Sequence, residues 1–319
     1  MVVSDNEVMR QPGPGGASPA PSRSRHRRPF STRNGVVILL FMLPAAVFVA
    51  AFTYYPILSG SQMAFRDWNL SNLTQTPWVG LDNFRAILAD PTFGRVALNT
   101  LVWVVASIVP QLVLGFGLAL LLRRRFRGRG VYQAMVFYPW AVAGFLIGML
   151  FRWMFNGEFG VINDLLRKSG LADSNIAWLA VPDLAMVAVV VANIWYGVTF
   201  FAIMILAALQ SVDESMLEAA ALDGAGRVRM LFSIMIPAIR AVLMLTVLLR
   251  VIWIFNFPDI IWAMTGGGPA DHTHIITTWM IQFTQQGNYG LASALGLICV
   301  AFLALFSVFY LMALKERDS

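Results

Sequence analysis

Long apolar stretches that alternate with short polar ones dominate this sequence. A helix needs about 20 mostly apolar residues to cross a bilayer, and six stretches reach that length. The pattern predicts an all-α integral membrane protein whose transmembrane helices cover residues 36–58, 96–122, 131–153, 184–209, 237–264 and 291–314. The first stretch is longer than a signal-peptide core and lacks a clear cleavage site, so we expect a retained membrane anchor.

Basic residues predict the orientation of these helices, because cytoplasmic loops carry an excess of Lys and Arg. Sixteen of the 23 Lys and Arg residues lie on one side of the six-helix arrangement, including Arg123, Arg124, Arg125, Arg127 and Arg129. Both termini are therefore expected in the cytoplasm, and the chain is expected in the cytoplasmic (inner) membrane. Residues 1–33 are rich in Pro, Gly, Ser and Arg, which predicts a disordered cytoplasmic tail.

A polar connector, residues 211–236, separates the fourth and fifth apolar stretches. Ser211 and Glu214 have the spacing of a capping box, which predicts a short helix through the following alanines that ends at Gly224. A second short helix should lead to Pro237, which can open the next membrane helix. The alternative is an amphipathic helix that lies on the membrane surface.

Composition excludes several function classes. With 58% hydrophobic residues, 13% charged residues and a mean hydropathy of +0.68, the chain has more apolar surface than a soluble globule can bury. The formal net charge of +6 does not indicate nucleic-acid binding, because the arginines gather at helix ends. Cys299 is the single cysteine, and the three histidines are scattered, so no disulfide or metal site is predicted. Neither lysine follows a phosphate-binding Gly-rich loop, so any ATP must be hydrolysed by another chain.

The fifth apolar stretch carries the polar residues most typical of a substrate path. Arg250, Trp253 and Phe257 recur at helical spacing on one face, and Pro258 can kink the helix beside them. An aromatic ring with nearby hydrogen-bonding groups suits a sugar, which has an apolar C–H face and many hydroxyls. The alternative is that Arg250 and Asp259 form an internal ion pair.

Several motifs resemble a known family. Glu218-Ala219-Ala220, then Gly224, then Ile234-x-Ile236-Pro237 is similar to the coupling loop of permease subunits of ATP-binding-cassette (ABC) importers. Arg250 and Asp259, followed by Thr265-Gly-Gly-Gly-Pro269, resemble the fifth helix and outer loop of the first permease subunit in maltose-type sugar importers. Gly80-Leu-x-Asn-Phe84, Asn99-Thr100 and the segment 289–294 also resemble carbohydrate permeases.

The resemblance implies the type I permease fold with six helices, and a role in transport instead of catalysis. It implies four partners besides lipid: a second, different permease chain, a pair of ATPase subunits that bind ATP and Mg, and an extracytoplasmic sugar-binding protein. The implied ATPase-coupling residues are Glu218, Ala219, Ala220, Asp223, Gly224 and Pro237. The implied substrate-path residues are Arg250, Trp253, Asn256, Phe257, Asp259, Trp140, Asn193, Gly197 and Phe200. We expect Gly115, Gly117, Gly144 and Gly148 to allow close helix packing.

Two other function classes remain alternatives. An ion-coupled secondary transporter would need intramembrane carboxylates and usually internal repeats, and Asp259 alone gives it little support. A membrane-embedded transferase or protease would need a nucleophile with its base, or paired acids, at membrane depth. The predicted helices contain no histidine, which argues against this enzyme class.

Overall fold

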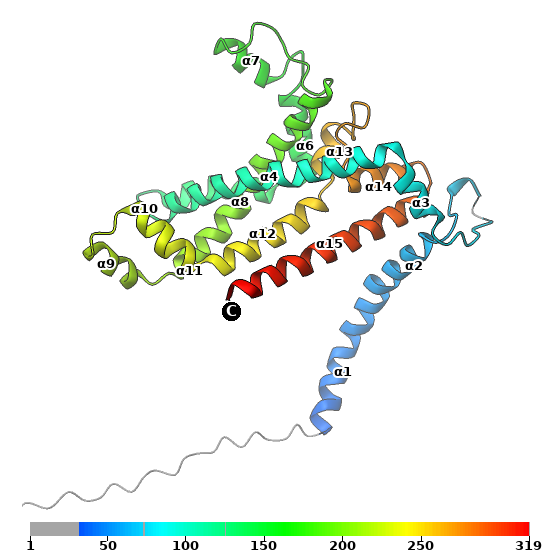
Figure 1. Ribbon diagram of the computed structural model, residues 1–319, viewed down its shortest axis with the longest axis horizontal. Coiled ribbons are helices and arrows are strands. Elements are labelled where there is room, and N and C mark those ends of the chain that lie inside the picture. The colour runs from blue at the N-terminus through cyan, green and yellow to red at the C-terminus, as the bar shows by residue number, and fades with distance from the viewer. Residues whose placement is uncertain (1–31, 73, 125, 319) are drawn as a thin grey trace, which may run out of the picture. The chain divides into compact units, whose positions relative to one another are not determined.

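The computed structural model describes residues 32–72, 74–124 and 126–318. The tail predicted over residues 1–33 lies almost entirely outside the described residues. Every regular element in the described part is helical (Figure 1). In chain order these are α1 Thr32–Val49, η1 Ala50–Tyr54, α2 Tyr55–Met63, η2 Leu70–Asn72, α3 Asp82–Ala89, α4 Pro91–Arg123, α5 Arg129–Phe137, η3 Tyr138–Ala141, α6 Gly144–Met154, α7 Val161–Lys168, α8 Pro182–Gln210, α9 Glu214–Leu222, α10 Arg227–Met230, η4 Leu231–Met235, α11 Ile236–Ala238, α12 Arg240–Phe255, α13 Asp259–Met264, α14 Ile276–Gln285 and α15 Tyr289–Asp318.

Within the described ranges, five stretches are long and apolar enough to cross a membrane. They are Leu39–Met63, Pro91–Arg123, Pro182–Gln210, Arg240–Met264 and Tyr289–Ala313. A sixth results if the bent pair Arg129–Ala141 and Gly144–Met154 counts as one. Each overlaps one of the six stretches expected from the sequence.

The third expected helix, over residues 131–153, is broken in the structure. The segments on either side of the break meet at 97°. Pro139 in η3 lacks the N–H that an unbroken helix would use, and Val142 and Ala143 adopt extended backbone angles. The break therefore lies at Val142 and Ala143, just after η3, and the extended backbone there lets α6 leave in another direction.

The chain divides into two units, Met1–Tyr55 and Pro56–Ser319. In the first unit, the side chains from Leu39 to Tyr55 are exposed and mostly apolar. This is expected of a helix that is surrounded by lipid or by another subunit. The second unit contains the hydrophobic core.

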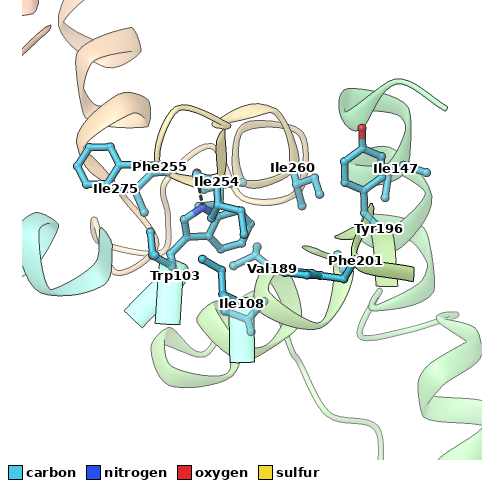
Figure 2. Packing of buried hydrophobic residues seen from close by; sticks show 14 of the residues in the cluster. Trp103, Ile108, Ile147, Val189, Tyr196, Phe201, Ile254, Phe255, Ile260 and Ile275 are labelled. Carbon is cyan, nitrogen blue, oxygen red and sulfur yellow. Dashed lines mark hydrogen bonds between the residues drawn. The ribbon is translucent and has the colours of Figure 1, made fainter. Parts of the chain in front are cut away.

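The core of the second unit forms where α4 packs along α8 and against α12. Trp103 of α4 is fully buried, and its indole N–H donates to the Ile254 carbonyl oxygen at 3.1 Å. Figure 2 shows this hydrogen bond among the packed side chains of Ile108, Val189 and Ile260. Lipid tails are as apolar as these side chains, so helix association in a membrane depends on close packing and internal hydrogen bonds.

Glycines permit the closest helix contacts. A Cβ on Gly115 would lie 2.5 Å from the Phe201 Cβ of α8, and one on Gly148 would lie 2.6 Å from the Ala263 Cβ. A Cβ on Gly144 would lie 2.2 Å from the ring of Phe257. The expectation was wrong for Gly117, where an added Cβ would have no neighbour within 4 Å.

The loop between α13 and α14 is tied to the start of α4. The side-chain amide of Asn99 donates to the carbonyl oxygens of His272 at 3.0 Å and His274 at 3.1 Å. The Thr100 hydroxyl oxygen accepts from the Ile276 N–H at 3.0 Å. The His274 ring is buried, and burial lowers its pKa below the ordinary value, while Asp271 at 3.6 Å opposes this shift. His274 is therefore held neutral inside this loop.

The connector folds as two short helical segments, but its cap differs from the expected one. Asp213, instead of Ser211, caps α9 by accepting from the Ser215 N–H at 2.9 Å, which also lowers the pKa of Asp213. The Ser211 hydroxyl donates to the Ala208 carbonyl oxygen. Gly224 follows α9 with a φ of +78°, the conformation expected of the residue that ends a helix.

Pro237 lies in α11, and the long helix α12 starts only at Arg240. Ile239 lies between α11 and α12, and its N–H donates to the Met235 carbonyl oxygen at 3.2 Å. The proline therefore opens the short segment before α12 and not α12 itself.

The Gly115 contact gives a matched test of packing. Gly115→Ala should cost about 1–3 kcal/mol, because overpacking forces α4 away from α8. Gly117→Ala should be neutral or stabilise by up to about 1 kcal/mol through helix propensity. Thermal unfolding of the purified chain in detergent measures both, and equal unfolding temperatures for the two variants would contradict the α4–α8 packing.

The buried His274 predicts a pH dependence. Its pKa is lower in the folded than in the unfolded chain, so the unfolded chain binds more protons between the two values. Its stabilising contribution is complete above the unfolded pKa of about 6.5 and decreases as pH falls toward the folded pKa. The unfolding temperature should fall between pH 7 and pH 5 less steeply in His274→Gln than in the wild type. Identical slopes would show that His274 is not the responsible group.

Candidate functional site

Arg250 of α12 is the centre of a buried polar network. Its side chain is 1% exposed, and its Nε donates to the Gln111 side-chain oxygen of α4 at 2.9 Å. The Gln111 amide donates in turn to the Asn193 carbonyl oxygen of α8 at 2.8 Å. The Asn193 amide donates to the Ser107 hydroxyl at 2.9 Å. The network therefore joins α4, α8 and α12 in the middle of the second unit.

Gly197 of α8 makes this network possible. A Cβ there would lie 2.2 Å from the Arg250 Nη2 atom and 2.3 Å from the Gln111 side chain. No side chain fits this position while the two polar groups hold their places. Gly197, which the sequence suggested as a substrate-path residue, thus lies against Arg250 and leaves space for its guanidinium.

Aromatic rings surround the guanidinium. The Arg250 Cζ atom lies 5.6 Å from the ring centre of Phe200 and 5.9 Å from that of Trp140, within the range of cation–π attraction. Trp140 contacts Trp253 edge-on at 5.0 Å between ring centres. Tyr196 stacks on Trp140 at 5.7 Å and on Phe257 at 5.5 Å. We call these five residues the aromatic cluster.

Two polar atoms in this network have no described partner. They are the Nη2 atom of Arg250 and the Oδ1 atom of Asn193, both buried. A buried donor or acceptor without a partner costs about 1–3 kcal/mol. Trp253, at 42% exposed, brings the cluster to the surface of α12. The arrangement combines the exposed Trp253 side chain with a buried donor and a buried acceptor that have no described partner.

The alternative, an ion pair between Arg250 and Asp259, does not form among the described residues. Arg250 is buried and bound to Gln111, whereas Asp259 is exposed at the start of α13. Asn256 also lies outside the network: its amide donates to the Ile252 carbonyl oxygen, and its oxygen accepts from the Cys299 thiol at 3.7 Å. The unwound residues 256–258, which include Asn256, lie between Arg250 of α12 and Asp259 of α13.

Sequence reasoning missed Gln111 and Tyr196. Gln111 is fully buried on α4, and Ser107 and Gln111 are polar residues one turn apart in the otherwise apolar stretch 101–122 of this helix. This spacing was the available signal, because polar groups at membrane depth usually face protein or a cavity. Tyr196 gives no such signal, because aromatic residues in apolar helices are common as packing residues as well as in binding sites.

The connector presents a second candidate surface at the end of the bundle where α4 and α8 finish (Figure 1). Glu218, Ala219 and Asp223 are exposed on α9 and its end. Large apolar side chains are exposed beside them, with Leu222 at 90%, Val228 at 71% and Phe232 at 63%. The Arg123 guanidinium at the end of α4 contacts the Met235 sulfur at 3.6 Å and so holds η4 to the bundle. Exposed leucine, valine and phenylalanine around an acidic group are typical of a protein docking surface.

Comparisons with known proteins show the family of this chain. Residues 111–317 match the family described as binding-protein-dependent transport system inner membrane component. The sulfoquinovosyl glycerol transport system permease protein SmoG of Agrobacterium fabrum is 30% identical over 284 residues, which cover 89% of this chain and 92% of that protein. The trehalose/maltose transport system permease protein MalF of Thermococcus litoralis is 30% identical over 278 residues, covering 87% and 93%.

A solved structure supports the same fold. A chain of a bacterial ABC transporter involved in the import of the acidic polysaccharide alginate superposes with a TM-score of 0.78 at 24% identity, covering 90% of this chain and 98% of that one. The family match includes the connector, α12 and the outer loop after α13. The chain therefore belongs to the family of inner-membrane components of binding-protein-dependent transport systems.

Proposed function

We propose that this chain conducts a sugar as the permease subunit of an ATP-driven importer, and that the sugar passes the aromatic cluster around Arg250. The observation that carries the proposal is the unpaired Arg250 Nη2 atom within a ring-lined site. A sugar can stack its C–H face on a ring while its hydroxyls bind the free donor and the free Asn193 acceptor. The carbohydrate names of SmoG and MalF support this substrate class.

The proposed substrate path includes all the substrate-path residues suggested by the sequence, and these fall into two groups. Trp140, Asn193, Gly197, Phe200, Arg250, Trp253 and Phe257 form or adjoin the network. Asn256 lies on the unwound segment beyond it, and Asp259 begins α13. We assign the first group to sugar contact and the second to the outer part of the path.

The connector couples this path to ATP hydrolysis on other chains. Glu218, Ala219, Ala220, Asp223 and Gly224 form a small exposed knob, and Pro237 lies where it returns to α12. A cleft of an ATPase subunit can enclose the small alanines, while Glu218 anchors the contact by charge-assisted hydrogen bonds. ATP and Mg bind to that subunit and not to this chain.

The complete importer contains three further kinds of subunit. They are a second permease chain, a pair of ATPases on the cytoplasmic side and an extracytoplasmic sugar-binding protein. ATP-driven closure of the ATPases moves the connector, and the attached helices open the path outward. Hydrolysis resets it inward.

Sugar-stimulated ATP hydrolysis by the complex purified through this chain tests the proposal, with candidate sugars presented on the binding protein. Glu218→Lys should lose ATPase association or stimulation, because it reverses the anchoring charge. Glu158 is exposed in the outer loop. Glu158→Lys makes the same charge change and should retain both ATPase association and sugar stimulation. Normal stimulation in Glu218→Lys would contradict the coupling role.

Trp253→Ala should leave the ATPases bound but raise the half-stimulating sugar concentration about three- to tenfold, since one aromatic contact contributes about 0.5–1.5 kcal/mol. Trp195→Ala is the matched control, because Trp195 is 41% exposed and contacts Phe151 outside the cluster. Equal shifts in the two variants would contradict the assignment of the aromatic cluster to the substrate path.

A further inference from the structure

A continuous apolar groove lies on the opposite side of α8 from the aromatic cluster. Its first part, of about 390 Å³, is lined by residues from the end of α4 and from α5, including Arg124, Phe126 and Tyr132. Its second part, of about 680 Å³, extends along α4 and α8 to Gly117 and Trp195. Leu118, Leu121 and Val136 line both parts, so the two form one groove. We call it the α4–α5 groove.

The groove lies beside α5, which does not continue in line with α6. The segments Arg129–Ala141 and Gly144–Met154 meet at 97°, with the break at Val142 and Ala143. No Cβ is present at Gly117 to fill the groove.

The groove has almost no polar group to offer. The Thr199 side chain lines its second part, but its hydroxyl already donates to the Val136 carbonyl oxygen at 2.8 Å. Among the other lining side chains of this part, Trp195 has one polar group, its indole N–H, and the rest are apolar. A sugar would lose most of its hydrogen bonds with water here, whereas hydrocarbon would lose nothing.

One end of the groove is strongly basic. Arg124 lines it, and Arg123, Arg127 and Arg129 adjoin it in sequence. None of these four arginines forms an ion pair with a carboxylate of the described chain. Arg124 and Arg127 are exposed. An elongated apolar molecule with an anionic end would match both the groove and this unneutralised charge.

We propose that the α4–α5 groove binds one anionic phospholipid, with its acyl chains along Leu118, Leu121 and Val136 and its headgroup phosphate at Arg124 and Arg127. Basic groups at the end of an apolar cleft between transmembrane helices attract anionic headgroups, and a zwitterionic lipid has no net charge to supply. The Arg123 contact with Met235 puts the headgroup end beside the connector. The lipid therefore binds where α4 meets the moving part of the chain.

Lipid retention by the full chain tests the site. The chain is reconstituted in nanodiscs with equal amounts of phosphatidylglycerol and phosphatidylcholine, extracted in mild detergent, and its retained lipids are counted by native mass spectrometry. The wild type should retain phosphatidylglycerol over phosphatidylcholine by about thirtyfold, since the two arginines near the headgroup contribute about 1 kcal/mol each. Arg124→Gln with Arg127→Gln should bring the ratio close to one. Arg85→Gln with Arg95→Gln, the same charge change outside the groove, should keep it.

A second variant tests the groove itself. Gly117→Leu places a side chain in space that is empty within 4 Å of the added Cβ, so it should fold normally and reduce retained phosphatidylglycerol severalfold. Gly94→Leu, on the same helix and equally unobstructed, should leave retention unchanged. In cell membranes, Leu114→p-benzoylphenylalanine should crosslink to phospholipid.

Three results overturn the proposal. The first is a wild-type ratio close to one. The second is unchanged retention in both the double arginine variant and Gly117→Leu. The third is capture of a polypeptide in place of lipid at position 114, which would assign the groove to another subunit.

Discussion

The buried hydrogen bond between Arg250 and Gln111 is the interaction on which the candidate path depends. A guanidinium at membrane depth is costly, and such groups persist only where protein or a water-filled cavity receives them. Gln111 binds one side of the guanidinium, Gly197 leaves room for another, and the rings of Trp140 and Phe200 cover its faces. One donor atom, Nη2, is left without a described partner.

The same interaction connects the site with the connector. α8, which supplies Asn193 and Gly197, ends at Gln210 just before the connector, and α12, which supplies Arg250, begins just after it at Arg240. Two of the three helices that form the network are therefore the two that the connector joins. In the proposed mechanism, a displacement of the connector would change the relative position of α8 and α12, which the Arg250 network links through Gln111 of α4.

Much of this arrangement could be predicted from the sequence, because the strongest signals are local. Apolar length gave the membrane helices, and Gly224 gave the end of α9. The break at Val142 and Ala143 was not predicted, since the apolar run continues through both residues and the nearby Pro139 is compatible with either a kinked or a divided helix. Arg250 and Trp253 were found from their spacing. Gln111 was not, because its partner is 139 residues away and only tertiary packing brings α4 to α12. The Arg250–Asp259 alternative failed for a related reason: sequence spacing does not reveal that the backbone unwinds between them.

Substrate protection of a cysteine at position 253 tests the central claim most directly. In the assembled importer with buried Cys299 replaced by alanine, Trp253→Cys should react with a water-soluble thiol reagent, and the transported sugar should slow that reaction. Leu305→Cys on α15, which is also exposed in the isolated chain, should show no protection by sugar. A position 253 that does not react, or that reacts equally fast with and without every transported sugar, would contradict a sugar path lined by the Arg250 network.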